Sequence, residues 1–242
     1  MDIKEIFFSY QAEGIYIGAP TIFIRFQGCN LDCYYCDERK AKKIIKSKNE
    51  FSVDKIVRII SNIIKNKKNI KFISITGGEP LIHKNLEILL IKLKELKKKF
   101  NFRIYLETNG SVSNYLSKII KYIDVVAIDF KNPIDSLQNT SIDLIKEFKR
   151  CIKICRESKK SYFVKLIISG RKRFSKRIIS IIKNTIKSLK LSLIILQPVT
   201  NEFKSNKKNL FLNVCDIFHE IKNDVKHIFI IPQLHKTVWE IK

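Results

Sequence analysis

Short apolar runs recur along the chain, and most are followed by a longer stretch with the periodicity of an amphipathic helix. Runs rich in Ile, Val and Phe predict β-strands at residues 21–26, 71–75, 102–106, 125–128, 163–168, 193–196 and 227–231. Between them, stretches with apolar residues at helical spacing predict helices over residues 53–64, 86–96, 144–154 and 178–189. Ser52 stands where the first of these helices needs an N-cap.

This alternation predicts an α/β fold on a parallel sheet with right-handed crossovers, because a helix between two strands returns the chain to the same end of the sheet. A closed or partly closed barrel and an open, doubly wound sheet both satisfy the pattern. No stretch rich in Pro, Gly and Ser divides the chain, so we expect a single domain over residues 1–242. The polar stretches 132–141 and 201–209 are predicted to be surface loops.

Composition raises the question of nucleic acid. The chain has 242 residues, of which 45% are hydrophobic, enough for one α/β domain with its own core. Its 47 basic and 23 acidic residues give a net charge of +24, which is typical of nucleic-acid-binding proteins. Only nine basic residues are Arg, however, and the Lys residues are scattered together with Ile and Asn, as an AT-rich coding bias would also produce. We therefore expect no direct contact with nucleic acid.

The chain shows no sign of a membrane or an oxidising compartment. No apolar run reaches the roughly 18 residues that span a bilayer, and the first residues do not form a signal peptide. We expect a cytoplasmic protein without a membrane partner, in which the six cysteines are reduced. A tight cluster of cysteines then indicates metal ligands before disulfides.

Glycines and polar residues gather where the predicted strands end. Gly28, Gly77, Gly78, Gly110 and Gly170 each come directly after a strand. The carboxyl ends of parallel strands meet at one edge of the sheet, and α/β folds keep their active sites there. We expect the site at this edge.

Three cysteines, Cys29, Cys33 and Cys36, lie within eight residues after the first predicted strand. Three thiolates on one short loop can hold three corners of a cubane iron–sulfur cluster, and a missing fourth Cys leaves one iron open to a small ligand. A zinc site with three Cys and one His, or inert buried thiols, are the alternatives, although zinc usually takes paired C-x2-C knuckles. The remaining cysteines, at positions 151, 155 and 215, are predicted to pack in the core.

The C-x3-C-x2-C spacing, with Tyr35 before its last Cys and Gly77-Gly78-Glu79-Pro80 further along, resembles the radical S-adenosylmethionine (SAM) superfamily. The resemblance implies a partial (β/α)6 barrel of parallel strands with outer helices. It also implies that Cys29, Cys33 and Cys36 hold a [4Fe-4S] cluster whose fourth iron binds SAM, and that the Gly-Gly-Glu-Pro backbone binds the methionine amino group.

Within that superfamily, residues 5–14, 18–20 and 23–31 resemble the start of the 7-carboxy-7-deazaguanine synthases. Residues 36–37, 107–110, 197–198 and 232–236 are similar to that family as well, so the resemblance spans the chain. It implies conversion of 6-carboxy-5,6,7,8-tetrahydropterin to 7-carboxy-7-deazaguanine with loss of ammonia, a step toward the tRNA bases queuosine and archaeosine. It further implies a homodimer, and an electron donor such as flavodoxin or ferredoxin, which the positive charge would attract.

The flat ring and carboxylate of a pterin need amide-type partners and a fixed cation. Gln11 suits the ring edge, and Arg25 suits the carboxylate because a lone Arg in an apolar strand should point into the mouth of the barrel. By resemblance, the substrate contacts are Tyr10, Gln11, Ala12, Glu13, Arg25, Thr76, Glu107 and His235. The SAM contacts implied in the same way are Tyr35, Cys36, Asp37, Gly78, Asp129, Phe130, Lys131, Gln197, Pro198, Val199 and Thr200.

The sequence departs from the family at three places. Ala12 stands where the family has Gly, which adds one methyl group. Glu38 replaces a Thr that binds Mg²⁺; a carboxylate suits Mg²⁺, so the metal site is either kept with a different geometry or lost. Asp129-Phe130-Lys131 replaces Ser-Pro-Lys and is similar to glycyl-radical activating enzymes. An activase that installs a glycyl radical on a partner protein is therefore an alternative function, and a basic nucleic-acid-binding metalloprotein is another.

Overall fold

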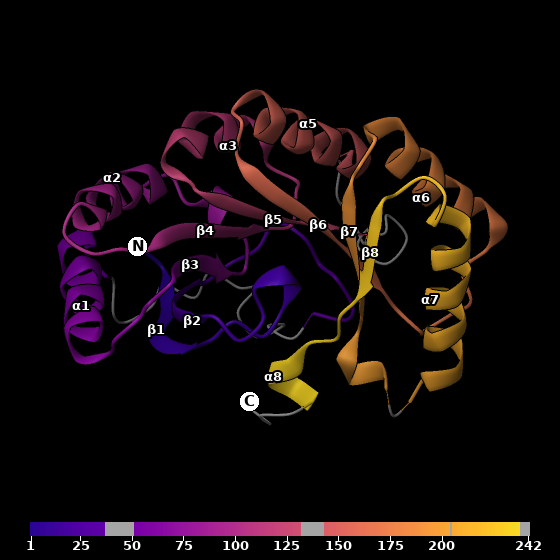
Figure 1. Cartoon of the computed structure of the whole chain (residues 1–242), viewed down its shortest axis with the longest axis horizontal. Helices are drawn as coiled ribbons and strands as arrows, with labels where there is room; N and C mark the ends of the chain where they lie inside the picture. Colours follow the sequence, from indigo (N-terminus) through magenta and orange to yellow (C-terminus); the bar gives the residue numbers. More distant parts are fainter. Residues whose placement is uncertain (37–50, 132–142, 204, 238–242) are drawn as a thin grey trace.

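The computed structural model describes residues 1–36, 51–131, 143–203 and 205–237, and its framework is one curved β-sheet. The strands follow one another across the sheet in chain order. They are β1 (Ile3–Tyr10), β2 (Pro20–Phe26), β3 (Phe72–Gly77), β4 (Arg103–Thr108), β5 (Val125–Phe130), β6 (Ser161–Ile168), β7 (Leu193–Pro198) and β8 (His227–Ile230). Figure 1 shows the sheet as an arch.

Strands β2 to β8 are parallel, and β1 pairs with β2 antiparallel. Over the described ranges, β1 and β8 each pair with one strand, so the arch is an incomplete barrel. The register places Arg25 of β2 beside Thr76 of β3, and Asp129 of β5 beside Lys165 of β6. Residues that face the inside of the arch near the carboxyl ends of the strands are thereby brought to the same level.

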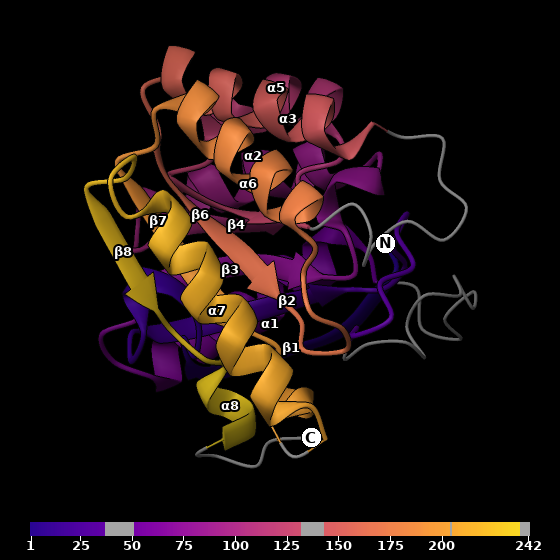
Figure 2. The same cartoon turned by 90° about the vertical axis from the view of Figure 1, so that its right-hand side faces the viewer.

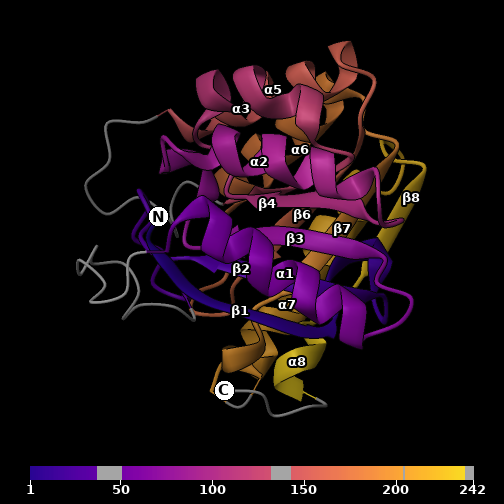
Figure 3. The same ribbon diagram turned by 90° about the vertical axis from the view of Figure 1, so that its left-hand side faces the viewer.

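Helices cover the convex side of the arch (Figures 1, 2 and 3). They are α1 (Val53–Asn66), α2 (Leu86–Lys97), α3 (Ser113–Ile119), α5 (Leu144–Glu157), α6 (Lys176–Leu189) and α7 (Lys207–Ile221). Short helices complete the described chain: η1 (Gly14–Tyr16), η3 (Pro80–Ile82), η4 (Ile120–Tyr122), η5 (Thr200–Glu202) and α8 (Leu234–Thr237). No helix among the described residues is long and apolar enough to cross a membrane.

Two apolar layers hold the sheet. The larger one lies between the strands and the outer helices and includes Ile24, Ile75 and Leu106. A smaller one lies inside the arch, where Phe72, Tyr105 and Phe163 pack with Val125, Ala127 and Ile195. Tyr16 of η1 covers this inner layer, with its ring 4.7 Å from that of Phe72. The inner layer fills the arch below the carboxyl ends of the strands. Space for a site is therefore left above the layer, at those carboxyl ends.

The predicted strands and helices are confirmed, with ends that differ by a few residues. Ser52 caps α1 as expected, since its hydroxyl accepts the N–H of Lys55 at 3.2 Å. Strand β1 was not predicted, because it is an edge strand whose two faces both mix polar and apolar residues. The loop expected at residues 201–209 is partly helical: η5 covers its start, and α7 begins at Lys207 with a polar first turn. The loop expected at residues 132–141 lies outside the described residues.

Cysteines outside the cluster motif behave in two ways. Cys151 and Cys155 are fully buried on α5, as predicted. The prediction for Cys215 was wrong, because this thiol is exposed on α7. It lies in an apolar hollow between α7 and β8 with Phe211 and Ile230, whose side chains are also exposed. Apolar neighbours at helical spacing therefore did not mean burial on this helix.

Candidate active site

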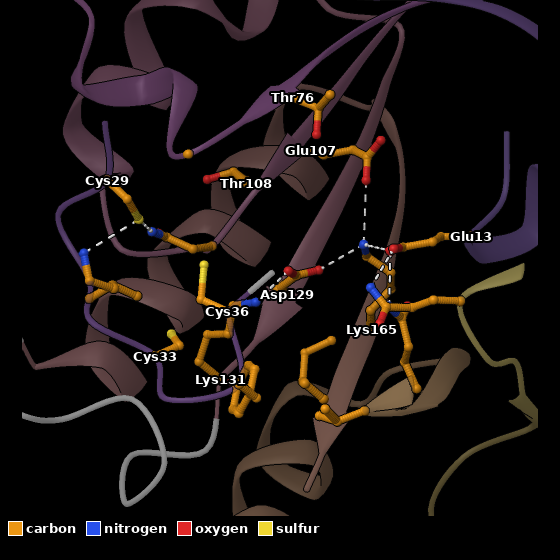
Figure 4. A pocket seen from close by; sticks show the side chains of 18 of the residues that line it. Glu13, Cys29, Cys33, Cys36, Thr76, Glu107, Thr108, Asp129, Lys131 and Lys165 are labelled. Carbon is orange, nitrogen blue, oxygen red and sulfur yellow. Dashed lines mark hydrogen bonds and ion pairs between the residues drawn. The ribbon is translucent and has the colours of Figure 1, made fainter. Parts of the chain in front are cut away.

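A cavity opens where the carboxyl ends of the strands meet inside the arch (Figure 4). Its volume is about 200 Å³. Figure 4 shows the three cysteines on one side and a charged cluster around Lys165 on the other, with Asp129 between them. The lining residues are Glu13, Cys29, Leu31, Cys33, Tyr35, Cys36, Thr76, Gly77, Gly78, Glu107, Thr108, Asn109, Asp129, Lys131, Lys165, Ile167, Gln197, Pro198, Val199 and Gln233.

Two glycines at the end of β3 let the cysteine loop lie against that strand. The N–H of Gly78 donates to the carbonyl of Phe26 at 2.9 Å, and the N–H of Glu79 donates to that of Gly28 at 2.8 Å. A Cβ atom on Gly78 would lie 1.7 Å from the carbonyl oxygen of Gly28. No side chain fits there, so Gly78 fixes the position of the residue that precedes Cys29.

The buried carboxylate of Glu79 joins β3 and β4 to the cysteine loop. Its oxygens accept the N–H of Leu81 at 3.1 Å, the hydroxyl of Thr108 at 2.8 Å and the N–H of Asn109 at 2.7 Å. Burial raises the pKa of Glu79 to about 7, although these donors act to lower it. The side-chain amide of Asn109 in turn lies 3.7 Å from the sulfur of Cys29. Glu79 thus positions a donor for a cysteine sulfur.

The three thiols present the donor set of an iron–sulfur cluster. They come from one loop, line one cavity, and Cys29 also accepts the N–H of Leu31 at 3.4 Å. Burial raises the pKa of Cys29 to about 11 and also raises that of Cys33, while the nearby Lys131 lowers both. Within the described ranges, no three His, Cys, Asp or Glu side chains are placed to hold a single metal ion. Three thiols from one loop that line one cavity fit a cluster held by thiolates, which form as protons are released on binding.

Asp129 belongs to both sides of the cavity. Its Oδ2 lies 2.7 Å from Nζ of Lys131, and that ammonium stands 5.7 Å from the ring centre of Tyr35 in the cysteine loop. Its Oδ1 lies 3.1 Å from Nζ of Lys165 on the neighbouring strand. One carboxylate therefore connects the cysteine side to the charged cluster.

Glu13 is held by segments from the far end of the chain. Its Oε2 accepts from Lys165 at 2.8 Å and from Gln197 of β7 at 2.9 Å, and its Oε1 accepts from Gln233 at 2.8 Å. His235 of α8 lies 3.9 Å from the same carboxylate. Burial acts to raise the pKa of Glu13, but the charge of Lys165 and these hydrogen bonds hold it well below its usual range.

Lys165 is the functional candidate that sequence reasoning missed. Its side chain is 3% exposed, and its Nζ contacts Glu13, Asp129 and, at 3.4 Å, Oε2 of Glu107. Glu107 is also held by Gln11 at 3.3 Å and Ser74 at 3.1 Å, and burial raises its pKa against the attraction of Lys165. A signal was present: Lys165 is a single charge inside an apolar strand, the same pattern that singled out Arg25.

The structure brings most of the predicted site residues together. Those that line the cavity are Glu13, Cys29, Cys33, Tyr35, Cys36, Thr76, Gly78, Glu107, Asp129, Lys131, Gln197, Pro198 and Val199. Gln11 and His235 reach it through Glu107 and Glu13, and Thr200 through a 3.4 Å contact with the N–H of Gln233. Asp37 and Glu38 lie outside the described residues, so the geometry of a Mg²⁺ site is not described.

The remaining four predicted contacts, Arg25 among them, also lie outside the lining. Tyr10 is 49% exposed at the end of β1. Ala12 is buried, its N–H donates to the side chain of Gln11 at 2.9 Å, and its carbonyl accepts from Leu234 at 3.1 Å. The ring of Phe130 points to the outer layer, where it stacks on Phe148 at 4.6 Å, so only its backbone can serve the cavity.

Arg25 sits beside Thr76 in the register but is engaged by β1. Its guanidinium contacts Glu5 at 2.6 Å and lies 5.1 Å from the ring centre of Phe7. All three residues are on strands that pair directly with each other. The antiparallel strand that the sequence did not predict thus supplies the partners of the predicted substrate cation.

Comparison with known proteins agrees with this geometry. The profile of the Radical SAM superfamily matches residues 23–183. The 7-carboxy-7-deazaguanine synthase of Methanocaldococcus jannaschii is 30% identical, with 97% of this chain and 98% of that protein covered. The enzyme of the same name from Geobacter sulfurreducens is 30% identical over 69% of each chain.

Solved structures show the same fold. The crystal structure of QueE from Escherichia coli matches with a TM-score of 0.50 and 21% identity, and covers 87% of this chain and 89% of that one. The structure of anSMEcpe with bound AdoMet matches with a TM-score of 0.62 and 15% identity, covering 84% of this chain and 58% of that one. The superfamily profile, the long alignments and the shared partial barrel agree: this chain belongs to the 7-carboxy-7-deazaguanine synthase family of radical SAM enzymes.

Proposed function

We propose that this protein converts 6-carboxy-5,6,7,8-tetrahydropterin to 7-carboxy-7-deazaguanine with loss of ammonia. The observation that carries the proposal is the two-sided cavity, with three cysteine thiols facing an array of buried carboxylates and amides (Figure 4). A cofactor end and a substrate end therefore share one enclosed space.

On the cofactor side, Cys29, Cys33 and Cys36 would hold a [4Fe-4S] cluster with SAM on its open iron. When bound, this pair supplies hydrogen-atom abstraction driven by one external electron. Gly78 lines the cavity beside the cluster loop, and its backbone would contact the amino acid part of SAM. Tyr35, Lys131 and residues 197–199 line the cavity and, together with Thr200, would contact the remainder of SAM.

On the substrate side, the carboxylates of Glu13 and Glu107 offer acceptors for the amino group and ring N–H donors of a pterin. Gln11, by holding Glu107, and Thr76, which lines the same wall, would orient the ring. We assign the substrate carboxylate to Arg25, since a guanidinium has five N–H donors and can hold Glu5 and a second carboxylate together.

The chain also keeps water away from the reacting atoms. Phe72, Tyr105 and Phe163, with Tyr16 packed on them, close the arch beneath the cavity. A ligand bound above this layer would be shielded from water on the side of the layer. Exclusion of water strengthens every charge interaction in the site and protects a radical from quenching.

The test is turnover. The protein is reconstituted with iron and sulfide without oxygen, then incubated with SAM, a chemical reductant and carboxytetrahydropterin, and a deazapurine is sought by mass and ultraviolet absorbance. We expect product from the wild type and none from Cys33→Ala, while the control Cys215→Ala, which changes an exposed thiol, keeps both iron and activity. Absence of product from wild-type protein with a full cluster overturns the proposal.

The proposal extends to partners and metal. We infer a single catalytic domain over residues 1–242 that works as a homodimer, an acidic one-electron donor attracted by the net charge of +24, and Mg²⁺ near Glu38. Analytical ultracentrifugation tests the dimer, and the salt dependence of turnover with a flavodoxin or ferredoxin tests the donor. Turnover with and without added Mg²⁺ after chelation tests the metal, and Glu38→Ala should abolish any stimulation.

A further inference from the structure

The ammonium group of Lys165 lies among three protein carboxylates. An ammonium has three N–H donors. Nζ of Lys165 contacts three carboxylate oxygens, one each from Glu13 at 2.8 Å, Asp129 at 3.1 Å and Glu107 at 3.4 Å. Its side chain is 3% exposed. The contacts with Glu13 and Glu107 are hydrogen bonds, and the contact with Asp129 is an ion pair. The buried ammonium is thus surrounded by carboxylates that line the cavity.

Each of these carboxylates is fixed at its second oxygen by a different part of the fold. Gln233 holds Glu13, Lys131 holds Asp129, and Gln11 and Ser74 hold Glu107. The ammonium is the one group that all three share among the contacts described here. Because Asp129 belongs to the cysteine side and Glu13 and Glu107 to the opposite side, Lys165 links the acceptors of two binding regions.

The charges of this array explain why a cation is needed at its centre. Three carboxylates and the ammonium groups of Lys131 and Lys165 leave one net negative charge when all are ionised. Without Lys165 the array would carry two, in a place where burial already raises the pKa of Glu107. The titratable groups that face Lys165 are Glu13 from the loop after β1, Tyr105 and Glu107 from β4, and Asp129 from β5, with Lys131 and His235 at the rim.

We propose that Lys165 is a positioning residue that holds the acceptors of the SAM side and the substrate side in one array and sets the charge that lets the cavity take an anionic substrate. The inference rests on the proposed function, because the anionic substrate is the carboxylated pterin. SAM, with its sulfonium, ammonium and carboxylate, carries a net positive charge. Loss of Lys165 should therefore harm the two ligands unequally.

The test measures binding of each ligand without turnover, on reconstituted protein with the cluster oxidised and no reductant present. We expect Lys165→Met to weaken binding of carboxytetrahydropterin about 100-fold at pH 8, the effect of one charge removed about 6 Å away at an effective dielectric constant of about 20. SAM binding should change less than about 5-fold. The array without Lys165 is more negative and attracts the positively charged SAM more strongly, which offsets the looser positioning of its carboxylates. A uniform loss for both ligands would overturn the proposal.

The pH profile separates a charge role from a merely structural one. In Lys165→Met, a carboxylate of the array takes up a proton as the pH falls from 8.5 to 6.5, so substrate binding should tighten over that range, while the wild type stays flat. Lys165→Arg, which keeps the charge, should keep the flat profile. A flat profile for Lys165→Met, or a sloping one for Lys165→Arg, overturns the proposal.

A charge-balanced variant covers the case in which Lys165→Met does not fold, since an unpaired buried charge can unfold a protein. Lys165→Met combined with Glu107→Gln removes one charge of each sign. It should fold and show a flat pH profile of substrate binding. Failure of the double variant to recover folding, or a sloping profile in it, overturns the proposal.

A matched control and an order of tests keep the inference separate from the proposed function. Lys183→Met removes an exposed lysine that pairs with Glu220 at 2.9 Å, and should change neither ligand's affinity. Turnover of carboxytetrahydropterin by the wild type tests the proposed function first. An active wild type together with a flat Lys165→Met profile refutes the role of Lys165 alone.

Discussion

Gly78→Ala is the sharpest test of how the fold positions the cysteine loop. The new Cβ atom would lie 1.7 Å from the carbonyl oxygen and 2.5 Å from the carbonyl carbon of Gly28. Ordinary contact begins at 3.4 Å, so the loop must move away by more than the length of a covalent bond. Both groups are backbone, and no flexible side chain can absorb the movement. The displaced residue directly precedes Cys29.

The cost follows from what that movement breaks. The hydrogen bonds from Gly78 to Phe26 and from Glu79 to Gly28 are lost or weakened, at about 1 kcal/mol each. Overpacking adds about 1–3 kcal/mol. A total near 3–5 kcal/mol corresponds to a fall in Tm of roughly 6–20 °C for a chain of this size. Because the thiols move apart, we also expect iron binding after reconstitution to fall below half of the wild-type content.

Gly18→Ala is the control, because Gly18 has a φ of +82° but nothing lies within 4 Å of an added Cβ atom. Gly18→Ala measures backbone strain of about 1 kcal/mol without a steric clash. Gly78 has no positive φ, so Gly78→Ala measures the clash without that strain. Thermal unfolding followed by circular dichroism, together with iron and sulfide analysis, measures both variants. The reasoning is refuted if Gly78→Ala has the same Tm as Gly18→Ala and binds as much iron as the wild type.

Three further predictions concern stability. Glu13→Gln removes a carboxylate whose pKa is held low by Lys165. The wild type gains stability from this carboxylate above its unfolded pKa of about 4.5 and loses that stability as the pH falls. In urea unfolding at a series of pH values, the stability advantage of the wild type over Glu13→Gln should therefore shrink below pH 5. Tyr105→Phe removes a buried hydroxyl that has no hydrogen-bond partner in the described part of the chain, and the variant should be as stable as the wild type or up to about 1 kcal/mol more stable by the same assay. Ser52→Ala deletes the cap of α1 and should cost about 1 kcal/mol, or roughly 2–4 °C in Tm, without any effect on iron content.

Each of these has a contradicting outcome. A pH-independent difference between the wild type and Glu13→Gln would mean that Lys165 does not perturb the carboxylate. A loss of more than about 1 kcal/mol in Tyr105→Phe would mean that the hydroxyl has a partner, such as a buried water. An unchanged Tm for Ser52→Ala would mean that the 3.2 Å contact with Lys55 contributes nothing to the helix.

The sequence was informative where a local pattern carries the signal. Buried parallel strands read as apolar runs, so β2 to β8 were found, and the spacing of Cys29, Cys33 and Cys36 indicated the cofactor side directly. Strand β1 was not predicted because, within the described residues, it pairs with a neighbouring strand on one edge only, and each of its faces carries both polar and apolar side chains. Its discovery matters, since Glu5 and Phe7 of this strand engage Arg25.

Non-local features escaped for a different reason. The carboxylates around Lys165 of β6 come from the loop after β1, from β4 and from β5. No residue spacing along the chain indicates that these segments lie next to one another. Cys215 was placed in the core because helical periodicity shows an apolar face but not what covers it. Phe130 lies at the carboxyl end of β5, as the motif predicted. Because side chains alternate between the two faces of a strand, its ring points to the outer layer and not to the cavity.

The partners of Glu13 have a consequence for the order of folding. Its partners Lys165, Gln197 and Gln233 stand 152, 184 and 220 residues beyond it, so its hydrogen bonds need almost the whole chain to be in place. Contacts between such distant segments form late, because the loop between them must lose its freedom first. A partly folded chain can already pack its cysteine loop against β2 and β3. In such a chain the partners of Glu13 are not yet in place. Completion of this carboxylate's set of partners and completion of the fold thus coincide.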